Sequence, residues 1–397
     1  MKKLSLYSSV VALSLTLLTG CEKDSLTETS VTQAPSHRSA RVASPLSDEL
    51  RAKLARIRAS LPEGYEQRVE RAAGLLQDTH PEYKQYVERA LGIEPTSCDN
   101  NTAATQWLDE QMADWNNDMI VLAYYTGMLD IPTYDALVFS NTSENQTFGA
   151  TGEYSHSNTK AFKDLKRFWN IQSDGIVLGA MHGSMLLDRD RVIRVNQVVY
   201  GDSPQAAAYW ADVIIDLLTE IPQYRSGNHP LFTFNAFAQS AFNFGPYGLI
   251  PSKIIMGDGI QDAFAGIGYA DVAPQAILAH EFGHHIQFQL RLFGANTPEA
   301  TRRTELMADA FSAYYLSHSR GAAMQWKRVK QFLQVFYNIG DCGFTNSGHH
   351  GTPAQRMAAA EWGYSVANNA QKQGHILTSQ EFTALFEAQL PALVAPN

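Results

Sequence analysis

The stretch Ala279-His280-Glu281-Phe282-Gly283-His284-His285 decides how the rest of the chain is interpreted. Pro274 fits the first turn of a helix, and an apolar periodicity continues from Ile286 to Phe293. The stretch therefore lies in the middle of a predicted helix. Residues four apart share one helical face, so His280 and His284 can direct two imidazoles at one cation.

Glu281 is offset from His280 by about 100° around the helix. This offset puts its carboxylate beside the cation, where a general base for a bound water belongs. Histidines four apart on a helix also occur by chance, and most such pairs bind nothing. A further ligand has to decide between the two interpretations.

Glu305 and Asp309 supply the acidic partners, and Glu305 follows His284 by 21 positions in a second predicted helix. A glutamate completes a set of two histidines and one carboxylate, which leaves a fourth position open for water, as in catalytic zinc sites. Asp309 lies on the same face and suits the role of acceptor for the free ring N–H of a ligand histidine. The alternative is a solvated acidic face. The apolar neighbours of both carboxylates disfavour it.

These residues resemble those of a known group of enzymes. His280-Glu281-x-x-His284 with Glu305-x-x-x-Asp309 resembles the gluzincin metallopeptidases. The segment Asn235-Ala236-Phe237-Ala238 is similar to the strand that precedes the zinc helix in membrane-associated zinc peptidases. The segment His350-Gly351-Thr352-Pro353-Ala354-Gln355-Arg356 is similar to a signature of bacterial neutral zinc metallopeptidases. The resemblance covers roughly residues 200–397.

The resemblance implies an α+β fold that is predominantly helical. A zincin-like catalytic domain is expected over residues 201–397, with a short antiparallel sheet over the zinc helix. Residues 230–237 and 253–256 are the candidate strands, and one of them would align a peptide substrate by β-augmentation. Residues 47–200 are expected to form a mainly helical N-terminal region.

The same resemblance implies a zinc metallopeptidase, and an endopeptidase is expected. His280, His284 and Glu305 would hold one Zn²⁺, and Glu281 would be the catalytic base acting on a peptide or protein substrate. His350 is the candidate for stabilising an oxyanion, with the alternative that it caps its loop or packs on Trp362.

Arg356 is expected to anchor an acidic partner rather than to contact substrate. Two competing functions stay open. The first is a catalytically inactive surface lipoprotein that binds zinc or peptide. The second is a structural lipoprotein in which the helices matter and the metal site is vestigial.

The N-terminal residues predict export. Residues 1–20 combine two lysines, a short apolar core and small residues before Cys21, as in a secretory signal peptide. Leu18-Thr19-Gly20-Cys21 resembles a bacterial lipobox, which implies a lipid on Cys21 and a membrane-anchored protein of the cell envelope. Glu22 favours the outer membrane, and residues 21–46 are expected to form a flexible tether. The alternative is a soluble secreted protein.

The net charge disfavours one class of partner, and the cysteine content allows one disulfide. The formal net charge of −9 makes the chain a poor candidate for binding nucleic acid. Apart from Cys21 the chain has Cys98 and Cys342. They would form one disulfide in an oxidising compartment or stay as two free buried thiols.

The N-terminal half contains further patterns of helical type. Helices are predicted over 48–60, 65–77, 81–91 and 105–126, and no second apolar run is long enough to cross a membrane. His182 lies among small residues and is interpreted as a histidine in a buried turn.

Overall fold

The histidine-bearing helix is α11, Ala273–Leu290, in the computed structural model, which describes residues 48–62, 65, 67, 68, 83–92, 102–295, 297–338, 351–373 and 375–395. Pro274 lies in its first turn, as predicted. The helix ends three residues before the apolar pattern does. The reason is that Arg291 adopts a left-handed conformation, with φ of 55°, and caps the last turn.

The helix that carries Glu305 is α12, Pro298–Ser317. The hydroxyl of Thr297 accepts a hydrogen bond from the backbone N–H of Ala300 and so caps its start. A third helix, α14, Pro353–Gln373, begins in the same way, because Thr352 accepts from the N–H of Gln355. Threonine followed by proline therefore sets the start of both helices.

The main sheet has three strands in the order β1, β5, β2, with β1 at Val177–Met181, β5 at Lys253–Gly257 and β2 at Ala236–Gln239. β2 pairs with β5 antiparallel, but β1 pairs with β5 parallel. The expected antiparallel sheet is therefore a mixed one. The long connection from β1 passes through two helices, α8 (Arg189–Val198) and α9 (Pro204–Glu220), and a crossover of this kind produces a parallel pair.

The sheet also joins the expected N-terminal region to the expected catalytic region. β1 comes from the expected N-terminal region, and it pairs along its whole length with β5 of the expected catalytic region. Residues Ala43–Asn397 accordingly form one compact unit. The candidate strand 230–237 is shorter than expected, because Pro230–Thr233 forms the 3-10 helix η4 and only β2 is extended.

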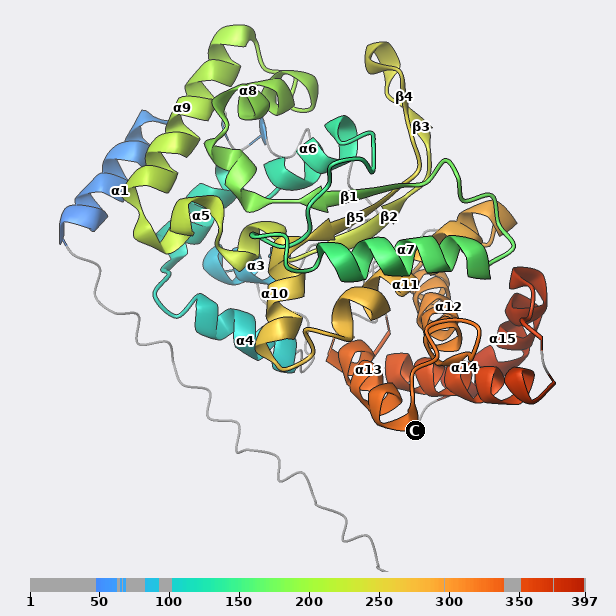
Figure 1. Cartoon of the computed structure of the whole chain (residues 1–397). Helices are drawn as coiled ribbons and strands as arrows, with labels where there is room; N and C mark the ends of the chain where they lie inside the picture. Colours follow the sequence, from blue (N-terminus) through green and yellow to red (C-terminus); the bar gives the residue numbers. More distant parts are fainter. Residues whose placement is uncertain are drawn as a thin grey trace, which may run out of the picture. The chain divides into compact units, whose positions relative to one another are not determined.

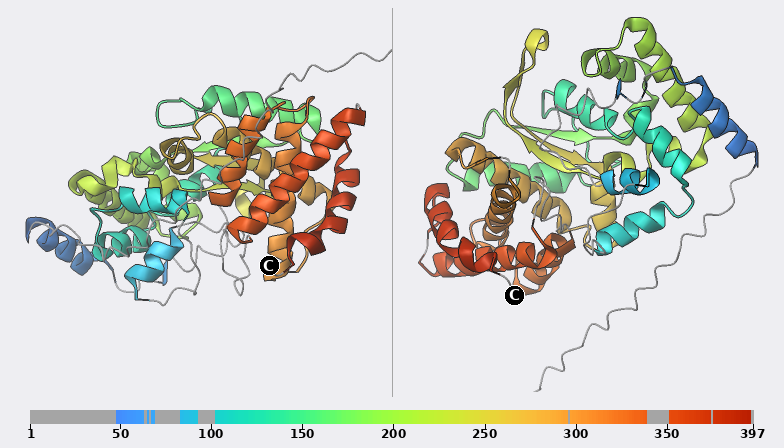
Figure 2. Two further views of the ribbon diagram at one scale, coloured as in Figure 1. Left: turned by 90° about the horizontal axis from the view of Figure 1, so that it is seen from below. Right: turned by 180° about the vertical axis from the view of Figure 1, so that it is seen from behind.

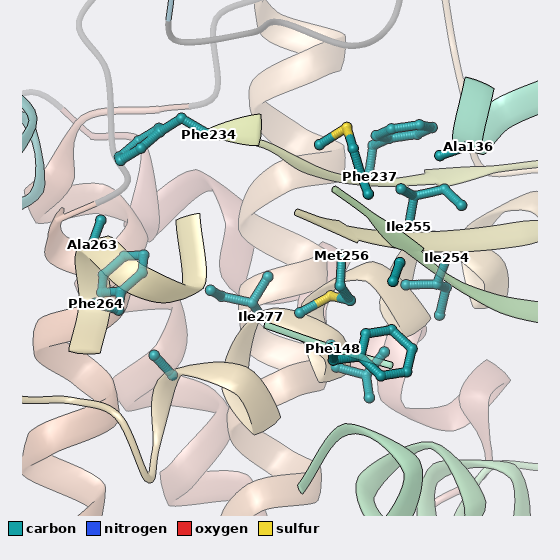
Figure 3. Close-up of a cluster of buried hydrophobic side chains, with 14 of the residues drawn as sticks. Ala136, Phe148, Phe234, Phe237, Ile254, Ile255, Met256, Ala263, Phe264 and Ile277 are labelled. Atoms are coloured by element: carbon teal, nitrogen blue, oxygen red, sulfur yellow. The ribbon is translucent and has the colours of Figure 1, made fainter. Parts of the chain in front are cut away.

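Helices cover both faces of the sheet (Figures 1 and 2). Helix α6, Ile131–Phe139, packs against β1 and β5, whereas α11 packs against β2 and β5. Figure 3 shows the side chains of β5 leaving the strand in opposite directions, with Ile255 toward Ala136 of α6 and Met256 toward Ile277 of α11. All five residues of β5 are buried. Beyond α11 the packing continues through α12 to α14.

The remaining helices surround these layers. The expected helix over 105–126 is two helices, because Asn116 accepts a hydrogen bond from the N–H of Met119 and starts a new one.

No helix within the described ranges has the length and apolarity needed to cross a bilayer. The other elements are α1 (Asp48–Ser60), α3 (Lys84–Ala90), α4 (Ala103–Gln111), α5 (Asn117–Tyr125), α7 (Ser155–Phe168), η2 (Gly183–Leu187), η3 (Pro222–Gly227), β3 (Phe242–Asn243), η5 (Gly245–Tyr247), β4 (Leu249–Ile250), α10 (Asp258–Gly266), α13 (Trp326–Asn338) and α15 (Ser379–Leu393).

Two glycines allow α12 to pack closely against both of its neighbours. A Cβ atom on Gly283 of α11 would lie 3.1 Å from Cα of Ala308, and one on Gly363 of α14 would lie 2.4 Å from the carbonyl oxygen of Ala310. The absence of side chains at these two positions therefore sets how near the backbones of the three helices come.

The substitution Gly363→Ala is expected to lower the free energy of unfolding by about 1–3 kcal/mol, because the added methyl forces α14 away from α12. Gly283→Ala is expected to cost less, since its closest backbone contact is longer. Urea denaturation measures both. Gly175→Ala is the control, because nothing lies within 4 Å of its added Cβ. Equal stability of the Gly363 and Gly175 variants would contradict the packing argument.

Candidate metal centre

Helix α11 brings two imidazoles together on one face. The rings of His280 and His284 lie 4.8 Å apart between centroids, with their planes at 86°. Their Nε2 atoms face each other at 3.1 Å. The spacing of four residues therefore has the consequence expected from the sequence.

The carboxylate of Glu305, on the neighbouring helix α12, faces both imidazoles. Its Oε2 lies 3.3 Å from Nε2 of His280, and its Oε1 lies 3.4 Å from Nε2 of His284. The three residues form a group that can hold a metal ion, with ligand atoms all within 4.8 Å of one another.

The second nitrogen of each ring makes a hydrogen bond that fixes its tautomer. Nδ1 of His280 lies 2.8 Å from Oδ1 of Asp309, which is the partner predicted from the sequence. Nδ1 of His284 lies 2.9 Å from Oε1 of Gln287. Both partners are acceptors, so each Nδ1 carries the hydrogen and each Nε2 directs a lone pair toward Glu305.

These distances fit a bound cation. Atoms bonded to one ion at about 2.0–2.1 Å in a tetrahedral arrangement lie about 3.3 Å from one another. The two imidazole Nε2 atoms lie 3.1 Å apart, and each lies close to that distance, 3.3 or 3.4 Å, from a different oxygen of the Glu305 carboxylate. Two facing lone pairs and a carboxylate need a positive species between them, and a metal ion or a proton supplies it.

Without a metal ion, the proton is held on one ring. Burial disfavours a charge on His280, but hydrogen bonds to Asp309 and Glu305 outweigh it and raise the pKa of His280 to about 9. Burial lowers the pKa of His284. Besides the two Nδ1 hydrogens, the pair of rings therefore holds one further proton, on Nε2 of His280, which a metal ion would have to displace.

Asp309 is itself held by an arginine. Nε of Arg356 donates to Oδ2 of Asp309 at 2.7 Å, and Nη2 donates to Oδ1 at 2.6 Å. Both side chains are buried, with exposed fractions of 2% for Arg356 and 0% for Asp309. The bidentate pair joins α14 to α12, and Asp309 is thus the acidic partner that was expected for Arg356.

Gln287 is the site residue that sequence analysis missed. Besides accepting from His284, its amide Nε2 donates to the backbone carbonyl of Thr304 at 2.7 Å, beside Glu305. This second bond determines which end of the amide faces the imidazole. A fully buried glutamine three residues after the second ligand is the signal that could have found it.

Two further histidines lie outside the metal group. His285 bonds to the backbone carbonyl of Lys253 at 2.8 Å, which fastens α11 to β5, and burial lowers the pKa of His285 to about 4. His182 follows β1 and bonds to Asp258 at 2.7 Å, directly after β5. It ties two strand ends together, but it is only half-buried and does not lie in a turn, so its interpretation as a histidine in a buried turn was wrong.

Glu281 is buried beside the ligands, since it follows His280 directly and is only 6% exposed. His350, Cys21, Cys98 and Cys342 lie outside the described residues. Gly351, directly after His350, packs against Leu306 and Arg302 of α12, because a Cβ at this position would lie 3.2 and 3.5 Å from their side chains.

Comparison of the chain with models of protein families, with curated proteins and with solved structures finds no match.

Replacing Gln287 by leucine is expected to weaken zinc binding about 10–100-fold, because His284 loses the acceptor that orients it. Competition with a chromogenic chelator measures the dissociation constant. Gln289→Leu is the matched control, since Gln289 is an exposed residue of the same helix that bonds to the backbone of Gln172. Equal affinities in the two variants would show that Gln287 does not orient the ligand.

The variant Arg356→Met is expected to lose about 3–5 kcal/mol of stability without metal, because the carboxylate of Asp309 stays buried without its guanidinium. Adding Asp309→Leu should recover part of that loss, since no carboxylate then remains. Chemical denaturation of the two single variants and the double variant measures the coupling. Simple additivity would mean that the pair contributes no interaction energy.

Proposed function

We propose that the chain is a zinc-dependent peptidase of the gluzincin type, with a zincin-like catalytic region. His280, His284 and Glu305 would hold one Zn²⁺. The observation that carries the proposal is the convergence of three residues whose ligand atoms lie within 4.8 Å of one another, with the two Nε2 atoms 3.1 Å apart and both Nδ1 atoms engaged by acceptors.

The donor set favours zinc in a catalytic role. Two imidazoles and one carboxylate leave a fourth tetrahedral position for water, whereas structural zinc sites are closed by four protein ligands. The same donors also hold Fe(II) in some oxygenases, and elemental analysis of the purified protein distinguishes the two metals. When bound, the zinc ion would polarise the scissile carbonyl and lower the pKa of a bound water toward about 7.

Glu281 would move the protons. Its position next to a ligand and its burial support a role as the base that accepts a proton from the attacking water and returns it to the leaving amine. Asp309 and Gln287 hold the tautomers of the two ligand histidines, and Arg356 keeps Asp309 in place.

His350 remains the candidate for stabilising the oxyanion. Two observations on neighbouring residues support it. Gly351 packs on Leu306 of α12, the residue after Glu305, and Arg356 of the same segment donates to Asp309. The substitution of a histidine in this role would lower turnover with little effect on the affinity for zinc.

The sheet supports a peptide as the substrate. Of the two candidate strands, β5 is paired on both sides, whereas β2 pairs only with β5 among the described strands. An extended peptide could add to the open edge of β2, next to α11, by main-chain hydrogen bonds. This mode of binding favours an endopeptidase acting on unfolded segments.

The location belongs to the same proposal. Export, a lipid on Cys21 and anchorage at the outer membrane would keep the peptidase at the cell envelope. Metabolic labelling with a fatty acid tests the anchor, because the label should enter the unaltered chain and be absent from a Cys21→Ser variant.

The decisive experiment is Glu281→Gln. The variant should keep one zinc per chain but lose at least about 100-fold in the hydrolysis of an unfolded casein-type substrate, because no base accepts the proton of water. Elemental analysis and a digestion assay with a chelator control measure the two properties. Glu299→Gln, an exposed glutamate in the first turn of α12, is the matched control.

The outcomes separate the competing functions. Unchanged turnover in the Glu281 variant would overturn the role given to that residue. Stoichiometric zinc in an unaltered chain without hydrolysis would indicate a zinc- or peptide-binding lipoprotein. A chain that retains no metal and takes none up would indicate a structural lipoprotein.

A further inference from the structure

A short β-hairpin leaves the end of the main sheet. Residues 240–252, called here the aromatic hairpin, connect β2 to β5, and within it β3 pairs antiparallel with β4 as a separate two-stranded sheet. Figure 1 shows β3 and β4 projecting away from the layers that cover the main sheet. The turn η5 forms the tip.

The hairpin presents apolar side chains to solvent. It contains no charged residue. Leu249 is 72% exposed and Tyr247 is 50% exposed, the two largest values among the exposed large apolar side chains of the described residues. The ring of Phe244 stacks on that of Tyr247 with 5.5 Å between centroids, and Phe244 is half-buried. The ring centroids of Phe242 and Phe244 lie 6.0 Å apart, so the three rings form one continuous apolar group.

An apolar group of this kind is unfavourable in water. Soluble proteins protect exposed edges and apolar patches with charges, prolines or covering elements, and an uncovered patch marks an interaction site. The aromatic hairpin has Pro246 and Pro251 but no charge to oppose association. A partner surface is therefore expected to cover it.

We propose that the aromatic hairpin inserts into the interfacial region of a phospholipid bilayer. This inference rests on the proposed lipid anchor. The chain between Cys21 and Asp48 spans less than about 100 Å even when fully extended, so an anchored protein stays next to the membrane surface. Tyrosine and phenylalanine at a hairpin tip suit the boundary between headgroups and acyl chains.

The charge of the chain is consistent with this occupant. A net charge of −9 gives no general attraction to anionic lipid headgroups. Binding through an uncharged tip depends on apolar burial instead, so a zwitterionic bilayer suffices and added salt should not release the protein.

Insertion would place the metal centre near the membrane. The base of the hairpin is joined to Gln239 and Lys253, which pair across β2 and β5. The carbonyl of Lys253 also accepts the hydrogen bond from His285, directly after the ligand His284. Lys253 therefore connects both the hairpin and the proposed catalytic helix to the sheet. The accessible substrates would be polypeptides at the membrane surface.

The test uses the mature chain with Cys21→Ser, which carries no lipid, and vesicles of phosphatidylcholine. This protein should cosediment with the vesicles, and the additional changes Tyr247→Ser and Leu249→Ser should reduce the bound fraction at least tenfold. Leu187→Ser with Leu385→Ser is the matched control, because both leucines are exposed and lie outside the hairpin. Thermal unfolding verifies that all the variants fold, and Leu249→Ser alone provides a milder change.

The outcomes distinguish the occupants. No vesicle binding by the starting protein, or equal binding by the hairpin variant, overturns the proposal. Concentration-dependent dimers that disappear in the hairpin variant would identify a second copy as the partner and also overturn it. Loss of casein-type hydrolysis without any change in vesicle binding would make the hairpin part of the substrate site instead. Vesicle binding requires neither zinc nor turnover, so its result is independent of the proposed peptidase activity.

Discussion

The carboxylate of Asp309 is the group on which the arrangement of the site depends. It has no contact with solvent, and it accepts hydrogen bonds from an imidazole of α11 and from a guanidinium of α14 while belonging to α12. A buried carboxylate is costly unless such donors surround it. The same bonds that stabilise the charge therefore fix the relative positions of the three helices and the orientation of the first ligand histidine.

The second ligand is held by a neutral counterpart of this arrangement. Gln287 joins His284 to the backbone of α12 through the two ends of one amide. Both histidines of α11 are thus positioned relative to α12, the helix that carries Glu305. His280 is held directly by Asp309, and His284 is held through Gln287. The glycine contacts at Gly283 and Gly363 bring the helices close enough for these short bonds to form. Packing and polar contacts consequently act on the same geometry.

Spacing along a helix is a local property, and it predicted what depends on local geometry. The intervals His280 to His284 and Glu305 to Asp309 required only the helical repeat, and the place of Pro274 in the first turn of α11 followed from the backbone of proline. The predominance of helix with a small sheet was confirmed. The parallel strand β1 was not predicted, because an apolar run of five residues does not show its pairing partner. The partner of Arg356 also required the fold, since Asp309 lies 47 positions away.

The parallel pairing of β1 with β5 has a consequence for how the protein reaches its native state. The paired residues Val177 and Lys253 are 76 positions apart, so this contact closes a long loop and loses chain entropy before any other strand contact offsets the loss. The helices that carry the ligands can form earlier from local sequence. The layer of α6, the sheet and α11 is then complete only after this distant segment has docked.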